Sequence, residues 1–172
     1  MLIEPLKENE PHLQRILREY KGEYFLCAVG DRKEELTINV EPNARNKSSL
    51  HARTDLTSTG DLLERRKIPA TTLDTLMKKH NFQPPFGLKI DTEGHEYQVV
   101  EGASEFLRAT QFVIAEVSVA KRFAGSYSFS EFIEIMDRSG FSLYDILKMK
   151  KTKPPLSKLQ FVDAMFRRTE RP

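Results

Sequence analysis

The order in which strand-like and helix-like segments follow each other limits the fold most strongly. Apolar runs of strand length alternate with segments whose apolar residues recur every three or four positions. Such alternation is typical of an α/β fold, in which a mainly parallel sheet carries helices on both faces. The expected strands are 2–3, 24–29, 36–40, 87–91, 112–117, 142–148 and 159–167, and the expected helices cover 13–20, 73–77, 97–107 and 128–136.

Local signals fix several element boundaries. Thr71 or Thr72 is expected to cap the helix that follows it, and Ser128 with Glu131 forms a capping box. The last two strands are joined only by the Lys- and Pro-rich turn 150–157, so we expect them to form an antiparallel hairpin.

Residues 41–69 are polar, contain proline, asparagine and glycine, and show no sustained period. Long stretches without secondary structure in a compact domain are often functional loops. We therefore expect a long loop here and consider it a candidate substrate lid.

The chain has 172 residues, of which 39% are apolar, so it can bury a core and is expected to form one domain spanning 1–172. No run approaches the ~18 apolar residues of a membrane span, and the N-terminus lacks the apolar region of a signal peptide. Cys27 is the only cysteine, which leaves no disulfide framework or zinc cluster and favours a cytoplasmic protein.

The charge is unevenly distributed. The net charge is +2, but residues 147–172 carry eight basic and two acidic residues, so this segment is +6 and the remainder −4. A basic segment can bind nucleic acid or an anionic surface. Without interleaved aromatic residues and a matching fold motif, nucleic-acid binding is the weaker interpretation, and a solvated face is the simpler one.

Three acidic residues stand where apolar strands end: Glu4, Asp91 and Glu116. A single such residue is more often a helix cap than a ligand contact. In parallel sheets, however, ligands bind beyond the carboxyl ends of the strands. Three acids on one rim therefore favour a shared crevice.

The segment 88–96 concentrates Asp91, Glu93, His95 and Glu96 at a strand-to-helix turn. Such a turn could hold a metal, an acid/base pair or an electrostatic clamp for a cationic ligand. A metal is not favoured, because ligands two residues apart across a turn need not converge and the other histidines, His12, His51 and His80, lie in unrelated segments. His95 alone is more often a helix-surface residue that packs against a loop.

Several of these segments resemble the signature blocks of the FkbM family of S-adenosylmethionine-dependent methyltransferases. The fairly specific block is Lys-Ile-Asp-x-Glu-Gly-x-Glu at 89–96, and it is accompanied by 72–76, 100–103 and 112–118. Weaker similarities at 3–5, 28–31, 48–50 and 162–166 extend the resemblance over residues 3–168.

The resemblance implies a Rossmann-like class I methyltransferase sheet and a site for S-adenosylmethionine. Glu4 would accept hydrogen bonds from the ribose hydroxyls, which suits a carboxylate that can only accept. Ala28 and Val29 would lie along the adenine, and Asp91 would lie beside the methionine part and the sulfonium.

The same resemblance implies transfer of a methyl group to oxygen of a small molecule, sugar or glycolipid. Glu93 and His95 are the candidates for the base that takes the proton of the acceptor hydroxyl. Glu116 would orient the acceptor or cap the next element.

One departure from the family pattern is large. The family begins with a strand and a glycine-rich turn that wraps the methionine part of the cofactor, and no Gly-x-Gly occurs among these 172 residues. The missing strand would lie in the middle of the sheet, between the strand that ends at Glu4 and the strand that ends at Asp91. We therefore expect an N-terminally truncated domain with two unpaired interior edges, which favours homo-oligomers.

Two functions follow from this departure. The first is a methyltransferase that binds its cofactor weakly or not at all as residues 1–172. The alternative is a non-catalytic binding or assembly module that has lost the cofactor motif.

Overall fold

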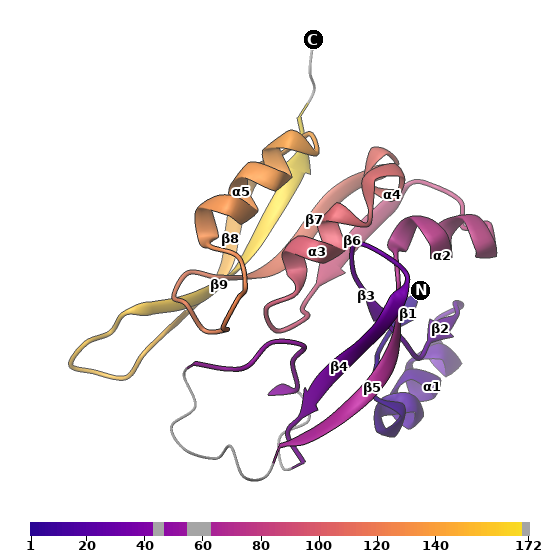
Figure 1. Ribbon diagram of the computed structural model, residues 1–172. Coiled ribbons are helices and arrows are strands. Elements are labelled where there is room, and N and C mark those ends of the chain that lie inside the picture. Colours follow the sequence, from indigo (N-terminus) through magenta and orange to yellow (C-terminus); the bar gives the residue numbers. More distant parts are fainter. Residues whose placement is uncertain (43–46, 55–62, 170–172) are drawn as a thin grey trace.

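The computed structural model describes residues 1–42, 47–54 and 63–169, and its strands form three small sheets (Figure 1). In the first, β1 (Leu2–Ile3) pairs parallel with β2 (Tyr24–Phe25). In the second, β5 (Glu64–Thr71) lies between β3 (Ala28–Val29), which is parallel to it, and β4 (Glu34–Val40), which is antiparallel.

The third sheet has four strands in the order β6 (Phe86–Ile90), β7 (Thr110–Ser118), β9 (Leu159–Arg168) and β8 (Phe141–Lys151). β6 is parallel to β7, whereas β7 with β9 and β9 with β8 are antiparallel. The expected α/β class and the C-terminal hairpin are thus confirmed. The sheets are mixed rather than mainly parallel, because three of the six strand pairs in the described residues, β4–β5, β7–β9 and β8–β9, are antiparallel.

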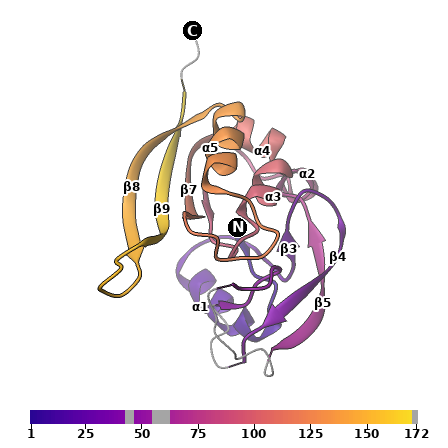
Figure 2. The ribbon, with the colours of Figure 1, turned by 60° about the vertical axis from the view of Figure 1, so that its left-hand side comes forward.

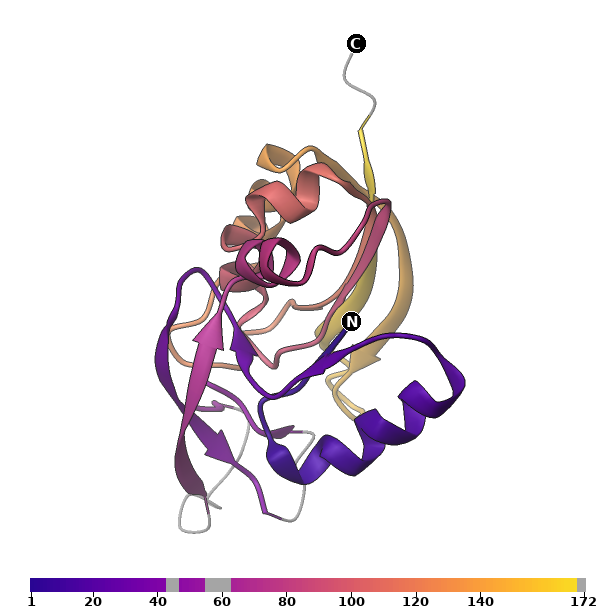
Figure 3. The ribbon, with the colours of Figure 1, turned by 90° about the vertical axis from the view of Figure 1, so that its right-hand side faces the viewer.

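Helices cover one face of the four-stranded sheet, as Figures 2 and 3 show. Val113, Ala115 and Val117 of β7 point to this face and are fully buried, whereas Phe112 points to the other and is exposed. The helices on this face are α2 (Leu73–His80), α3 (Glu96–Glu101), α4 (Ser104–Arg108) and α5 (Phe129–Arg138). α1 (Glu10–Glu19), preceded by a turn of 3-10 helix at Lys7–Asn9, lies apart from them (Figure 3). Within the described ranges, none of these helices has the length and apolar character that crossing a membrane requires.

The apolar side chains form two clusters. The larger one lies between the four-stranded sheet and the helices, and includes Phe132 and Met136 of α5 and Phe166 of β9. The smaller one is formed by side chains of the β3-β5-β4 sheet, including the buried Ile38 and Ile68, together with Leu6. Each of the two larger sheets therefore has a core of its own.

Three expected elements differ in the structure. The apolar run 24–29 is two strands, because β2 pairs with β1 while β3 pairs with β5 in another sheet. The expected loop 41–69 contains β5, whose residues from Glu64 pair with β4, and residues 43–46 and 55–62 lie outside the described residues. The expected helix 97–107 breaks at Gly102 into α3 and α4.

Gly102 explains the break in that helix. A Cβ at this position would lie 1.9 Å from the carbonyl oxygen of Gly30. The backbone after α3 therefore approaches the loop after β3 more closely than any side chain would permit.

The edges of β1 and β6 that face each other pair with no strand in the described part of the chain. A cavity of about 540 Å³ lies between them, lined by Ile3 on one side and Leu88 on the other. This is where the family resemblance places the strand that the sequence lacks. The cavity leaves both strands with one unpaired row of backbone groups.

Candidate functional site

The candidate site is built around the turn 91–96, where β6 passes into α3. Glu93 and Gly94 have positive φ angles of 50° and 100°, so the chain reverses sharply here. A Cβ on Gly94 would lie 2.6 Å from Cγ of Phe123. Glycine is therefore required at this position both by the backbone and by the space available.

The carboxylate of Glu96 holds this turn in shape. Glu96 is 1% exposed, and its Oε1 accepts hydrogen bonds from the backbone N–H and the hydroxyl of Thr92 at 2.9 and 3.1 Å. The N–H of Gly94 donates to both carboxylate oxygens at 3.1 Å, and the hydroxyl of Tyr127 donates to Oε2 at 2.6 Å. Burial, together with the charge of Glu96, raises the pKa of Tyr127, so this phenol remains a donor. Glu96 is thus a positioning residue.

His95 is buried beside this turn. Its Nδ1 lies 3.2 Å from Nε2 of His51, while its Nε2 is buried without a hydrogen-bond partner in the described residues. A Cβ on Gly30 would lie 2.9 Å from that Nε2. Burial, with a further contribution from His51, lowers the pKa of His95 to about 4. His95 is therefore a neutral ring at physiological pH.

Four charged side chains form a buried network at the end of β7. Arg122 donates to Glu116 Oε1 at 2.8 Å and to Glu93 Oε2 at 3.0 Å, and Arg53 donates to the same Glu93 oxygen at 3.0 Å. Burial raises the pKa of both glutamates, and the guanidinium of Arg122 opposes this shift. Arg122 therefore holds the carboxylates of Glu93 and Glu116, both with a raised pKa, close together.

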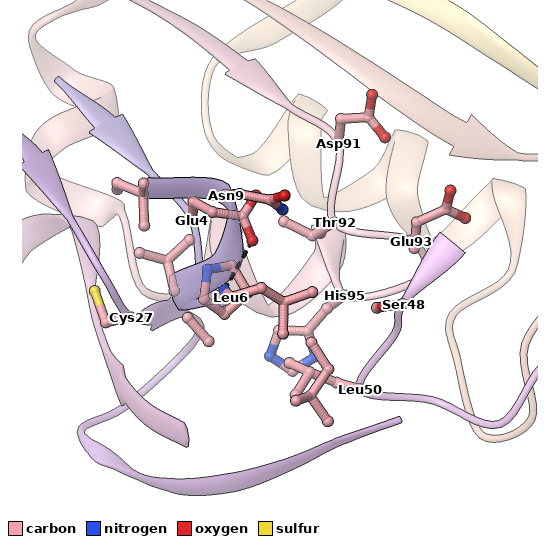
Figure 4. A pocket seen from close by; sticks show the side chains of 15 residues that line it. Glu4, Leu6, Asn9, Cys27, Ser48, Leu50, Asp91, Thr92, Glu93 and His95 are labelled. Atoms are coloured by element: carbon pink, nitrogen blue, oxygen red, sulfur yellow. Dashed lines mark hydrogen bonds between the residues drawn. The ribbon is translucent and has the colours of Figure 1, made fainter. Parts of the chain in front are cut away.

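A cavity of about 340 Å³, here called the Glu4 pocket, opens between β1, β3 and the turn 91–96 (Figure 4). In Figure 4, Asp91 and Glu93 lie together on one side of it and Cys27 on the other. The pocket brings together six residues that the sequence singled out: Glu4, Ala28, Val29, Asp91, Glu93 and His95.

Glu4 and Asp91 differ in how the protein holds them. Oε1 of Glu4 accepts the N–H of Leu6 at 2.8 Å, which fixes the carboxylate just after β1. Asp91 is exposed, and Oδ2 of its carboxylate lies 3.1 Å from Nζ of Lys89. Both acids therefore stand at the carboxyl ends of strands, as expected.

Glu116, the seventh predicted residue, lies in an adjoining cavity of about 550 Å³, here called the Glu116 pocket. Asp91 and Glu93 line both pockets, so the two cavities meet at these carboxylates. The other residues that line the Glu116 pocket are Lys47, Arg53, Arg122, Lys150, Gln160 and Phe161.

Asp91, Glu93 and Glu116 each place one oxygen within 4.8 Å of the others, which is close enough to share a metal ion. Each carboxylate, however, already has a cationic partner: Lys89 for Asp91, and Arg122 for the two glutamates. This acidic group is therefore largely neutralised by the protein itself.

Residues 47–54, one of the described parts of the expected lid, lie across the turn 91–96. Ser49 donates its hydroxyl to the backbone oxygen of Glu93, His51 contacts His95, and Arg53 pairs with Glu93. The expectation that His51 belongs to an unrelated segment is wrong, because the chain folds this segment back onto the site. Ser49, His51 and Arg53 thus attach this segment, here called the strap 47–54, to the turn.

Sequence reasoning missed Arg53 and Arg122 as well as His51. The contact between Arg53 and Glu93 joins residues 40 positions apart, and nothing local marks either arginine.

A crystal structure of an FkbM methyltransferase from Methylobacillus flagellatus KT is similar over 96% of this chain and 35% of that one, with 13% sequence identity and a TM-score of 0.48. This chain thus spans about a third of the length of that protein. No curated protein matches.

The family model described as "Methyltransferase FkbM domain" matches residues 1–143. The match contains β1, the strap 47–54 and the turn 91–96, and so includes every residue that lines the Glu4 pocket. This chain therefore belongs to the FkbM methyltransferase domain family.

Proposed function

We propose that this protein transfers a methyl group from S-adenosylmethionine to a hydroxyl of a small molecule, sugar or glycolipid. The observation that supports the proposal is the meeting of the two pockets. Glu4, Ala28, Val29 and Asp91 line the Glu4 pocket, and Asp91 and Glu93 also line the Glu116 pocket. A donor in one cavity and an acceptor in the other would share the same two carboxylates.

The side chains that line the Glu4 pocket suit the cofactor. The carboxylate of Glu4 can only accept hydrogen bonds, and its Oε2 has no partner among the described residues. Ala28 and Val29 are small, apolar and buried, which suits contact with a flat base. When bound, the cofactor supplies the electrophilic methyl group on its sulfonium, and Asp91 would lie beside that positive charge.

The geometry favours Glu93 over His95 as the base that takes the proton of the acceptor hydroxyl. Glu93 faces both pockets, and burial raises its pKa. His95 has one nitrogen against His51 and the other buried against Gly30. His95 would instead position the turn that carries Glu93.

The Glu116 pocket would hold the acceptor. Arg122 fixes the carboxylate of Glu116. This carboxylate can then accept a hydrogen bond from a hydroxyl of the methyl-accepting substrate in a constant direction. Gln160 and Phe161 add an amide and a ring face to the same cavity. The single cysteine favours the cytoplasm as the place of the reaction.

The proposal is tested by the binding of S-adenosylhomocysteine to residues 1–172, measured by ligand-observed NMR and calorimetry. Because the chain lacks a Gly-x-Gly turn, we expect weak, saturable binding with a Kd of about 0.1–1 mM. Glu4→Gln should weaken this binding about tenfold or more, because it removes a charge-assisted hydrogen bond.

Glu19→Gln, at the exposed end of α1, is the matched control and should bind as the parent does. Absence of binding up to several millimolar would mean that the Glu4 pocket of residues 1–172 does not hold the cofactor. Equal losses from the Glu4 and Glu19 variants would show that the ligand does not occupy the Glu4 pocket.

A further inference from the structure

The end of the β8–β9 hairpin differs from the rest of the surface. Figures 1 and 2 show the hairpin extending beyond the body of the protein. Its end, residues 147–160 and here called the basic tip, contains five lysines and no acidic residue: Lys148, Lys150, Lys151, Lys153 and Lys158. The positive charge noted in the sequence is thus concentrated on a projecting element.

Large apolar side chains stand among these lysines. Leu147, Met149 and Leu156 are 50%, 60% and 70% exposed. Single exposed apolar residues are ordinary, but here three of them stand on one projecting hairpin end and leave apolar surface in water.

The lysines at the far end of the tip are available to an external partner. Lys151, Lys153 and Lys158 are exposed, and within the described ranges none of them forms an ion pair. Lys148 differs, because its Nζ lies 3.7 Å from Asp163 and 5.5 Å above the ring of Phe161. Three exposed lysines of the tip, in the same turn region as Leu156, thus form no ion pair with the described residues.

We propose that the basic tip docks on an anionic lipid surface. Lysines attract acidic headgroups, and leucine and methionine side chains gain free energy by entering the boundary between headgroups and acyl chains. A nucleic acid fits less well, because single strands are held by rings that stack on bases and residues 147–160 contain no aromatic residue.

The position of the tip relates this docking to the candidate site. Lys150 belongs to the basic tip and also lines the Glu116 pocket, together with Gln160 and Phe161. A bilayer against the tip would therefore lie beside the mouth of the acceptor cavity. Docking at this place would present lipid-borne hydroxyls to the proposed reaction.

The test is cosedimentation of the full chain with vesicles of phosphatidylcholine alone and of phosphatidylcholine with about 40 mol% phosphatidylglycerol. We expect binding to the anionic vesicles only, weakened by salt. The triple variant Lys151→Gln, Lys153→Gln, Lys158→Gln should lower the partition coefficient on the order of 100-fold. Leu156→Ser should lower it about tenfold.

The matched control removes three exposed lysines elsewhere, Lys21→Gln, Lys33→Gln and Lys79→Gln, and should bind vesicles as the parent does. Equal binding to both vesicles, an equal loss in the control, or tighter binding to duplex DNA than to anionic vesicles would overturn the proposal. The assay contains no cofactor or acceptor, and Glu4→Gln should bind vesicles normally. Its outcome is therefore independent of the proposed methyl transfer.

Discussion

At the residue scale, the shape of the candidate site depends on Glu96. Its carboxylate accepts hydrogen bonds from Thr92, Gly94 and Tyr127. In Glu96→Gln, an amide NH₂ would face one of these donors, so we expect a loss of about 3 kcal/mol in the free energy of unfolding, measured with urea. Glu101→Gln, on the exposed end of the same helix, should change it by less than about 0.5 kcal/mol. Equal stabilities of the two variants would contradict the assigned role.

A second residue-scale prediction concerns His95. Its pKa in the folded protein is about 4, against 6.5 for an unperturbed histidine, so the unfolded chain binds more protons between these values. The stability that this difference supplies is complete above pH 6.5 and is lost as the pH falls to about 4. The loss should reach about 3 kcal/mol, measured by urea unfolding at pH 7 and pH 4.

Replacing His95 by leucine should remove most of this pH dependence, because an apolar side chain has no proton to gain. His12→Gln, an exposed position on α1, is the control and should keep the dependence of the parent. An unchanged pH dependence in the leucine variant would show that other groups cause it.

Residues that stand at strand ends could be predicted from the sequence, whereas their partners could not. Glu4 and Asp91 follow apolar runs and stand at the strand ends that the chain indicates, whereas β7 continues past Glu116 to Ser118. Arg122 and His51 enter the site only through the fold, because each contacts a glutamate or histidine on another element.

At the element scale, local signals were reliable. Thr72 caps α2 by accepting the N–H of Thr75 at 3.0 Å, and Ser128 and Glu131 form the predicted capping box of α5. In both caps the two bonded residues are three positions apart, so the signal can be recognised in the sequence. The strand β5 was missed because its buried residues, Ile68 and Ala70, are few and Pro69 between them suggests a loop. Proline is tolerated there because β3 pairs only with the two residues that follow it.

Gly102 supplies the prediction at this scale. In Gly102→Ala the new Cβ would overlap the carbonyl oxygen of Gly30, so α3 and the loop after β3 must move apart. We expect a loss of about 3 kcal/mol or more in the free energy of unfolding, measured by urea denaturation. Gly22→Ala is the control, because its Cβ would meet the flexible end of Leu17 at 3.2 Å and the backbone nitrogen of Met1 at an ordinary 3.9 Å, and it should change stability by less than about 1 kcal/mol. Similar losses in both variants would exclude the close approach as the cause.

At the scale of the whole molecule, the most consequential feature is the pair of unpaired strand edges on β1 and β6. β1 and β6 both present backbone groups to the cavity between them, and Ile3 and Leu88 expose part of their side chains there. The site is affected as well, because Glu4 and Asp91 follow these two strands and line the Glu4 pocket. Whatever fills the cavity would therefore also set the distance between the two acids.

The expected consequence is self-association through these edges. The N–H groups of Leu2 and Glu4 donate toward β2, so the N–H of Ile3 points to the opposite side, into the cavity. Ile3→Pro removes this donor without removing a β1–β2 hydrogen bond, whereas Ile3→Val keeps it. We expect the parent and Ile3→Val to form dimers or larger species between about 5 and 200 μM in sedimentation equilibrium, and Ile3→Pro to associate at least tenfold more weakly. A monomeric parent over this range would mean that the edges close without a second copy, and equal association of all three proteins would place the contact elsewhere.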